Sequence, residues 1–116
     1  MMAPPILRDI VRQHAEMAAF LWMIYDHHLL HPDENPEMDE VRLARLIERL
    51  EAHLDGLRVA GDRGHKIAQE RYEEFHEAGE LFVLRMLVAP KPIRVVDLDL
   101  VKVRQYLAMA LQQKQL

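Results

Sequence analysis

The sequence contains no cysteine, serine or threonine among its 116 residues. Without cysteine, neither a disulfide framework nor a thiolate metal site can form, and this absence fits a reducing cytoplasm. Without thiol or hydroxyl nucleophiles, the common covalent routes of acyl transfer are closed. We therefore expect a cytoplasmic protein that is not an enzyme and carries no cofactor.

Glycine is also scarce, and long apolar runs are missing. Four glycines, without a G-x-G-x-x-G pattern or a P-loop, are too few for the usual nucleotide-binding loops. The longest apolar stretch, Ala15 to Tyr25, is interrupted by Glu16 and is shorter than the roughly 20 residues that cross a bilayer. The N-terminus lacks a signal-peptide layout, because its charges follow its first apolar residues. We predict no membrane span.

Charge is distributed unevenly along the chain. Residues 1–84 hold nine Lys/Arg and seventeen Asp/Glu, a charge of −8, and residues 85–116 hold six Lys/Arg and two Asp, a charge of +4. A nucleic-acid-binding protein needs a basic stripe, whereas most of this chain is acidic. We interpret the basic end as solvated helix faces and predict no nucleic-acid partner.

What the chain does have is helix-forming composition. Leu, Ala, Met, Glu and Arg dominate, which favours helix over strand. A chain of this length makes one domain and buries a core without disulfide or metal support. We predict an all-α fold: an irregular five-helix bundle forming a single domain over residues 1–116, with a three-helix N-terminal part at 4–79 and a helix pair at 80–113.

The most regular apolar pattern lies between Leu43 and Gly64. Leucine or isoleucine recurs there at steps of four and three, which draws one stripe along a helix; the stripe comprises Leu43, Ile47, Leu50, Leu54 and Leu57. Asn35 followed by Pro36 is the predicted helix start, with Asp39 as an alternative cap. A turn at 61–64 ends the helix. Gly56 is expected to allow close packing against the first helix near Ala15, Ala18 or Ala19.

Proline and glycine divide the rest of the chain. The first helix is predicted from Pro4 or Pro5 to about Leu30, ending before Pro32. The third is predicted at 65–76 with Phe75 facing inward, and Gly79 marks a break. The fourth, at 80–89, is apolar all round and is expected to be buried. The fifth starts near Asp97 or Asp99 and runs to about residue 113, after a loop at 93–96.

Seven histidines invite a metal hypothesis. His27 and His31 are four residues apart on one helix face, a spacing that can hold a metal ion, but no third ligand is fixed by spacing. We interpret them as solvated histidines at a helix C-terminus and predict no metal site. Glu73 and His76 form a single E-x-x-H, whereas di-iron bundles need two.

His14 and His53 are the candidate buried polar residues. His14 lies on the apolar face of the first helix, and His53 flanks the leucine stripe. Buried histidines are usually hydrogen-bonded, and the candidate partners are acids nearby in sequence, namely Glu16, Glu51 and Asp55. A small-ligand or metal-binding bundle that uses His14, His53, His27 and His31 is the alternative to an interaction protein.

Two stretches resemble a known family. QHAEMAAFLW at 13–22 and HLDGLRVAG at 53–61 are similar to the N-terminal signature of a proteobacterial family of HEAT-repeat proteins. The resemblance implies a helical cap on a helical repeat, with a HEAT-like helix pair at 80–113. It implies an adaptor or immunity role linked to bacterial type VI secretion, and it supplies no catalytic residues. The chain looks like a short member of this family, or the N-terminal region of one.

A terminal helix pair leaves one face without the next repeat to cover it. The predicted contact residues on that face are Leu100, Val103, Leu107 and Leu111, with Arg104 at the rim. We therefore predict a non-enzymatic protein–protein interaction module. Its partner is another protein or a second copy of the chain, the latter most simply as a two-fold dimer.

Overall fold

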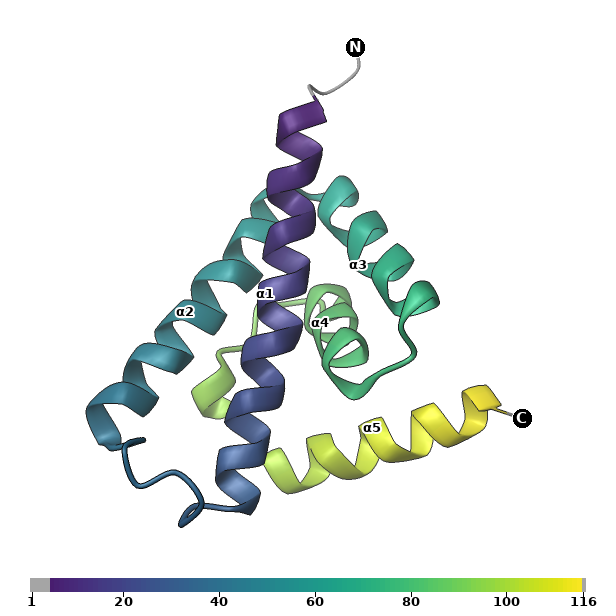
Figure 1. Ribbon diagram of the computed structural model, residues 1–116. Helices are drawn as coiled ribbons and strands as arrows, with labels where there is room; N and C mark the ends of the chain where they lie inside the picture. The colour runs from purple at the N-terminus through teal and green to yellow at the C-terminus, as the bar shows by residue number, and fades with distance from the viewer. Residues whose placement is uncertain (1–4, 116) are drawn as a thin grey trace.

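The computed structural model describes residues 5–115 (Figure 1). The described elements are α1 (Pro5–Leu30), α2 (Glu40–Val59), α3 (Asp62–Glu74), α4 (Ala78–Val88), the 3-10 helix η1 (Val95–Asp97) and α5 (Leu100–Gln115). No strand occurs within residues 5–115, so the predicted all-α helical bundle is confirmed. Pro4, the alternative start of the first helix, lies outside the described residues. No helix in this range is long and apolar enough to cross a membrane.

The longest helix, α1, is the centre of the bundle. Figure 1 shows it passing between α2 and α3, which diverge on either side, and α1 packs against α2, α3 and α4. Its buried residues face more than one neighbour and comprise Val11, Ala15, Ala18, Ala19, Leu21, Trp22 and Tyr25. The helix ends before Pro32, because proline disfavours helical geometry in the residue that precedes it. The core therefore covers more than one side of α1, whereas Phe20 and Met23 on the remaining side are exposed.

The leucine stripe of α2 faces the core as predicted. Leu50, Leu54 and Leu57 are buried, and Leu43 and Ile47 are partly buried against them. The cap is Asp39, the alternative start, whose Oδ1 accepts a 2.8 Å hydrogen bond from the Arg42 backbone N–H. Asn35 instead organises the preceding loop, where its Oδ1 accepts from the Glu37 N–H at 3.1 Å.

Two glycines expected to punctuate the chain lie inside helices instead. α3 begins at Asp62, and Gly61 alone takes the positive φ of +62° that turns the chain. At Gly64, a Cβ would lie 2.1 Å from the Leu57 carbonyl oxygen. At Gly79, inside α4, it would lie 2.7 Å from the carbonyl oxygen of Ala19. Both glycines are there because another backbone passes too close for a side chain.

The break between α3 and α4 falls at residues 75–77. Phe75 caps α3 in an extended conformation and is exposed, so the prediction that it faces inward was wrong. Leaving the helix rotates its side chain off the buried face, and the ring lies 4.6 Å beneath the Arg71 guanidinium. Helix phase therefore could not place this residue.

α4 is the most enclosed of the short helices. It packs against α1, α2, α3 and α5, and its buried apolar residues are Leu81, Phe82, Val83 and Met86. Phe82 stacks on Trp22 of α1, with ring centroids 3.9 Å apart and an interplanar angle of 2°. Arg85 and Val88 reach the surface, so burial is extensive but not complete around the helix.

A connection through η1 brings the chain from α4 to α5. Val95 is buried, and its backbone N–H donates to the carboxylate of Glu51 on α2, which is itself buried. η1 thus occupies part of the predicted loop, and Val96 is exposed before α5 begins. The backbone of α5 packs closely against α4, and a side-chain contact joins α5 to α1 through Arg104 and Asp26. Figure 1 shows α4 nearly end-on and α5 lying across the view, and the HEAT-like description of this pair stays a prediction.

Candidate functional site

The predicted contact stripe of α5 holds this helix on the bundle. Leu107 is only 4% exposed, and Leu100, Val103 and Leu111 are half-buried against the core. The reason is that the apolar surface of α4 already covers this face of α5, a packing that a repeat pattern in the sequence does not specify. The large apolar residues that α5 leaves exposed are different ones: Val101, Tyr106 and Met109.

Arg104 is an anchor between α5 and α1. Its Nη2 and Nε donate to Oδ1 of Asp26 at 2.6 and 3.0 Å. Both side chains are partly buried, which strengthens such a charge-assisted pair. Sequence reasoning placed Arg104 at the rim of an interface, and it missed Asp26 because the two residues lie 78 positions apart.

A groove lies between α4 and α5. Its volume is about 430 Å³ and its lining is mainly apolar, with Met86, Ile93 and Val103 among the lining residues. Two basic residues, Arg85 and Lys102, also line it. Packing of α4 against α5 therefore creates a partly basic apolar groove beside the exposed residues of α5.

The structure brings His14 and His53 together between α1 and α2. Their Nδ1 atoms are 3.0 Å apart and half-buried. A single N–H can occupy that contact, so one imidazole donates and the other accepts. Gly56 leaves room for the pair, because a Cβ there would lie 2.7 Å from the His14 ring. Gly56 therefore does meet the first helix closely, and the nearest atoms there belong to His14, next to the predicted Ala15.

The acids expected to pair with these histidines have other partners. Glu51 accepts from the backbone of Val95, and Asp55 pairs with Arg58 at 3.0 Å. Glu16 pairs with Arg12 and Arg71, each at 3.3 Å. The two histidines thus use each other because the neighbouring carboxylates are engaged by other groups.

Burial lowers the pKa of His53 below its usual value, and the nearby charges of His14 and Arg49 lower it further. Protonating both imidazoles would set two N–H donors against each other across the 3.0 Å contact. The pair therefore favours a state with at most one positive charge.

This pair predicts a pH dependence of stability. The unfolded chain binds the His53 proton more tightly than the folded protein does. The stabilisation of the fold by the neutral histidine pair is therefore complete above about pH 6.5, and it declines as the pH falls toward the lowered pKa of His53. We expect His53→Asn to make stability less sensitive to acid than in the parent, by about 1 kcal/mol or less because the site is half-buried. Urea unfolding on both sides of that pH measures it. Exposed His65→Asn is the control, and equal acid sensitivity in the parent and His53→Asn would contradict the assignment.

The second histidine pair gains a third residue from the following loop. Nε2 of His27 lies 3.2 Å from Oε2 of Glu34, and Nδ1 of His31 lies 3.7 Å from the same oxygen. One ligand atom from each of the three residues lies within 4.8 Å of the others, and all three residues are exposed. Among the described residues, this is the group that could hold a metal ion. Sequence spacing missed Glu34 because a turn brings it back.

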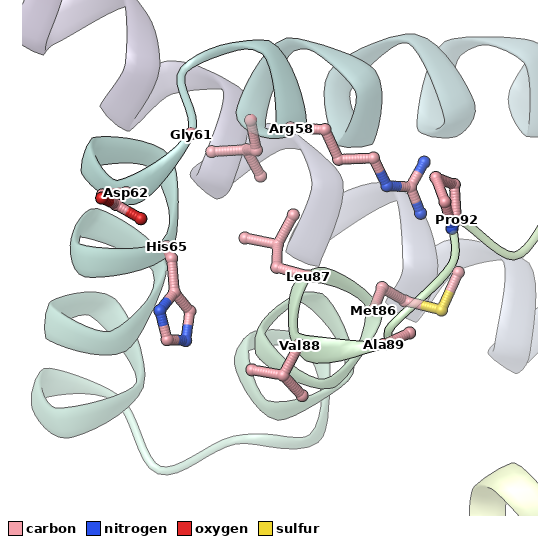
Figure 2. Close-up of a pocket in the computed structure, with 10 residues that line it drawn as sticks. Arg58, Gly61, Asp62, His65, Met86, Leu87, Val88, Ala89 and Pro92 are labelled. Atoms are coloured by element: carbon pink, nitrogen blue, oxygen red, sulfur yellow. The ribbon is translucent and has the colours of Figure 1, made fainter.

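Figure 2 shows another cavity, of about 340 Å³, where α2, α3 and α4 meet. Its charged lining residues do not converge. Arg58 donates to Asp55 at 3.0 Å and to the Ile93 carbonyl at 3.5 Å. Asp62 lies at the first turn of α3, and His65 extends between α3 and α4 (Figure 2). Nothing in this arrangement pairs a base with a reactive group.

Two acidic side chains are buried among the described residues, Glu51 and Glu80. The sequence analysis named Glu51 as a possible partner of the histidines and did not single out Glu80. Burial raises the pKa of Glu80, partly offset by hydrogen bonding and by Arg71. Arg71 lies 3.5 Å from Glu80 and 3.3 Å from Glu16, so it connects α3 with α4 and α1. Such a shift can mark a catalytic acid; in this bundle the Arg71 pairings also hold three helices together.

Fold and sites together define an all-α helical bundle with an apolar C-terminal groove and two histidine pairs. No protein-family model matches the sequence, and comparison with curated proteins and with solved structures yields no match. The resemblance to the HEAT-repeat family therefore stays a prediction.

Proposed function

We propose that this chain is a non-enzymatic protein-interaction module that binds its partner through α4 and α5. The observation that supports it most directly is the apolar surface of α5. Val101 is 60% exposed and Met109 is 61% exposed, although the other face of the helix is buried on α4. Tyr106 of the same helix is also exposed and lines the groove. Apolar surface that continues into a groove is typical of a protein interface.

Charge indicates what kind of partner fits. The groove is apolar, with Arg85 and Lys102 in its lining, and residues 85–116 carry a charge of +4. A partner helix with an apolar stripe and acidic flanks would match both features. The acidic part of a second copy, residues 1–84 with a charge of −8, meets the electrostatic requirement, so self-association as a two-fold dimer is the simplest form of the proposal.

The resemblance to HEAT-repeat proteins supports the same class of role. Helical repeats bind through surfaces that the next repeat does not cover. Within that class we propose an adaptor or an immunity protein linked to bacterial type VI secretion. An adaptor would bind a component of the secretion machinery, and an immunity protein would bind a secreted toxin.

The test is to place charge on the exposed face of α5. We expect the double variant Val101→Glu/Met109→Glu to fold like the parent and to lose self-association or partner binding by at least about tenfold, since buried unpaired charge at an interface is costly. Val59→Glu is the control for an added surface glutamate, because it places one such charge at an exposed valine of α2. Leu107→Glu is unsuitable, since Leu107 belongs to the core.

Light scattering across a micromolar concentration series measures self-association, and binding to purified candidate partners is measured in parallel. The proposal is supported if the double variant in α5 weakens self-association or partner binding and Val59→Glu does not. The proposal would be overturned if the parent stayed monomeric and if the parent and the double variant bound every tested partner with equal affinity.

A further inference from the structure

We propose that His27, His31 and Glu34 form a binding site for one divalent transition-metal ion of the zinc class. Two imidazoles and one carboxylate are a ligand set that suits Zn²⁺, Ni²⁺ or Cu²⁺ and not Mg²⁺ or Ca²⁺, which prefer oxygen. The site lies where α1 ends and the loop toward α2 begins. It is independent of the proposed interaction surface on α5.

Two of the three distances between ligand atoms lie close to those of tetrahedral coordination, and all three are within 4.8 Å. Metal–nitrogen and metal–oxygen bonds of about 2.0–2.2 Å place neighbouring ligand atoms about 3.3–3.6 Å apart. In the structure Oε2 of Glu34 lies 3.2 Å from Nε2 of His27 and 3.7 Å from Nδ1 of His31. The two rings tilt by 37° with centroids 4.6 Å apart, so small side-chain rotations bring all three atoms around one ion.

The backbone preorganises the three ligands. The His31 N–H donates to the His27 carbonyl at 2.9 Å, which extends the helical hydrogen bonding of α1 to the second ligand. The Glu34 N–H donates to the His31 carbonyl at 3.1 Å, which closes a four-residue turn with Pro32 at its second position. Proline presets the φ that this position needs. Metal binding would therefore cost little additional ordering of the backbone.

The next turn fixes the loop from the other side. Asn35 accepts from the Glu37 N–H at 3.1 Å through its side chain, and its carbonyl accepts from the Met38 N–H at 3.1 Å. Asp39 then caps α2. Glu34 thus lies between two hydrogen-bonded turns, which explains how a loop residue can act as a reliable third ligand.

Three protein ligands leave one position of a tetrahedral ion open, as in catalytic zinc sites. All three ligands line a cavity of about 360 Å³, whose apolar lining includes Phe20, Met23, Ile24 and Met38. His28 lines the same cavity, and its buried Nδ1 has no hydrogen-bond partner among the described residues. The open position would accept a small ligand against the apolar walls of this cavity.

An ion pair between Glu34 and a protonated histidine would give similar distances without any metal. Only a metal site would bind one ion per chain and give bound Co²⁺ a characteristic visible spectrum. We therefore propose titrating untagged protein with Zn²⁺ by calorimetry and with Co²⁺ by visible absorption. We expect one equivalent to bind, and the Co²⁺ protein to show the intense bands of four-coordinate geometry. The variants are His27→Ala, His31→Ala and Glu34→Gln.

Each variant should weaken binding by at least about tenfold, since even outer-shell partners of a metal cost about 10–100-fold. His65→Ala and His76→Ala are matched controls, being exposed histidines elsewhere, and should bind like the parent. Val101→Glu/Met109→Glu should also retain metal, which separates this proposal from the interaction surface. Substoichiometric binding, or binding that the control histidines reduce as strongly as His27 and His31 do, would overturn the proposal.

Discussion

Replacing Trp22 with alanine is expected to lower the free energy of unfolding by about 3–5 kcal/mol, the range for large buried aromatics. Trp22 is 1% exposed and stacks on Phe82, so it joins α1 to α4 at the centre of the bundle. Tyr25 meets it edge-on at 6.1 Å. Alanine would remove both ring contacts and leave a cavity between α1 and α4, which the packed helices around it cannot easily close.

Such a loss is a large fraction of the about 5–15 kcal/mol that stabilises a typical domain. Urea or thermal unfolding measures it. Phe20→Ala is the matched control, because Phe20 lies two residues away on α1 but is 56% exposed; we expect it to change stability by about 0.5 kcal/mol or less. Equal losses for the two variants would contradict the packing of α1 against α4.

Truncating the leucine stripe is expected to have the second largest effect. Leu50→Ala and Leu54→Ala should each cost about 2–5 kcal/mol, because both side chains are fully buried and alanine leaves a cavity. α2 packs on α1, α3 and α4, so relaxation around either site would have to move several helices at once. Because the structure around the cavity can relax little, we expect the loss in free energy of unfolding to lie in the upper part of this range.

Val59→Ala is the control for the stripe, since this residue of α2 is exposed and its truncation should be nearly neutral. Chemical denaturation of the three variants at one pH measures the differences. If both leucine variants lost less than about 0.5 kcal/mol, α2 would not present its stripe to the core.

Local sequence patterns were sufficient to predict most of the helical elements. Leu50, Leu54 and Leu57 repeat with the period of a helix, a spacing that indicates one buried helix face. Pro32 stops α1 by its own covalent geometry. Asp39 caps α2 with a side-chain hydrogen bond that spans three residues. Each of these features acts over a few positions, so neighbouring residues suffice to reveal it.

Glycine was the residue type that local reasoning interpreted least well. Gly64 and Gly79 read as turn signals but lie within helices. Their absent side chains make room for the carbonyl groups of Leu57 and Ala19. Close packing of a second backbone arises only in the folded molecule. It cannot be predicted from the residues that flank each glycine in the sequence.

The candidate sites divide in the same way. Helical spacing paired His27 with His31, but a turn was needed to add Glu34. Likewise His14 and His53 were recognised as polar residues near apolar faces, but not as partners of each other. Sequence distance hides such contacts, because helix packing joins residues that are 39 positions apart in the case of His14 and His53.

The sequence by itself determined that this chain is all-α and which side of α2 faces inward, because apolar periodicity is written into consecutive residues. Only the tertiary structure decided which apolar faces cover one another. α4 covers Leu107 and its neighbours, which turns Val101 and Met109 outward. Asp26 engages Arg104, which fixes α5 to the end of α1. Burial depends on the arrangement of whole helices, and that arrangement is settled by packing among distant residues.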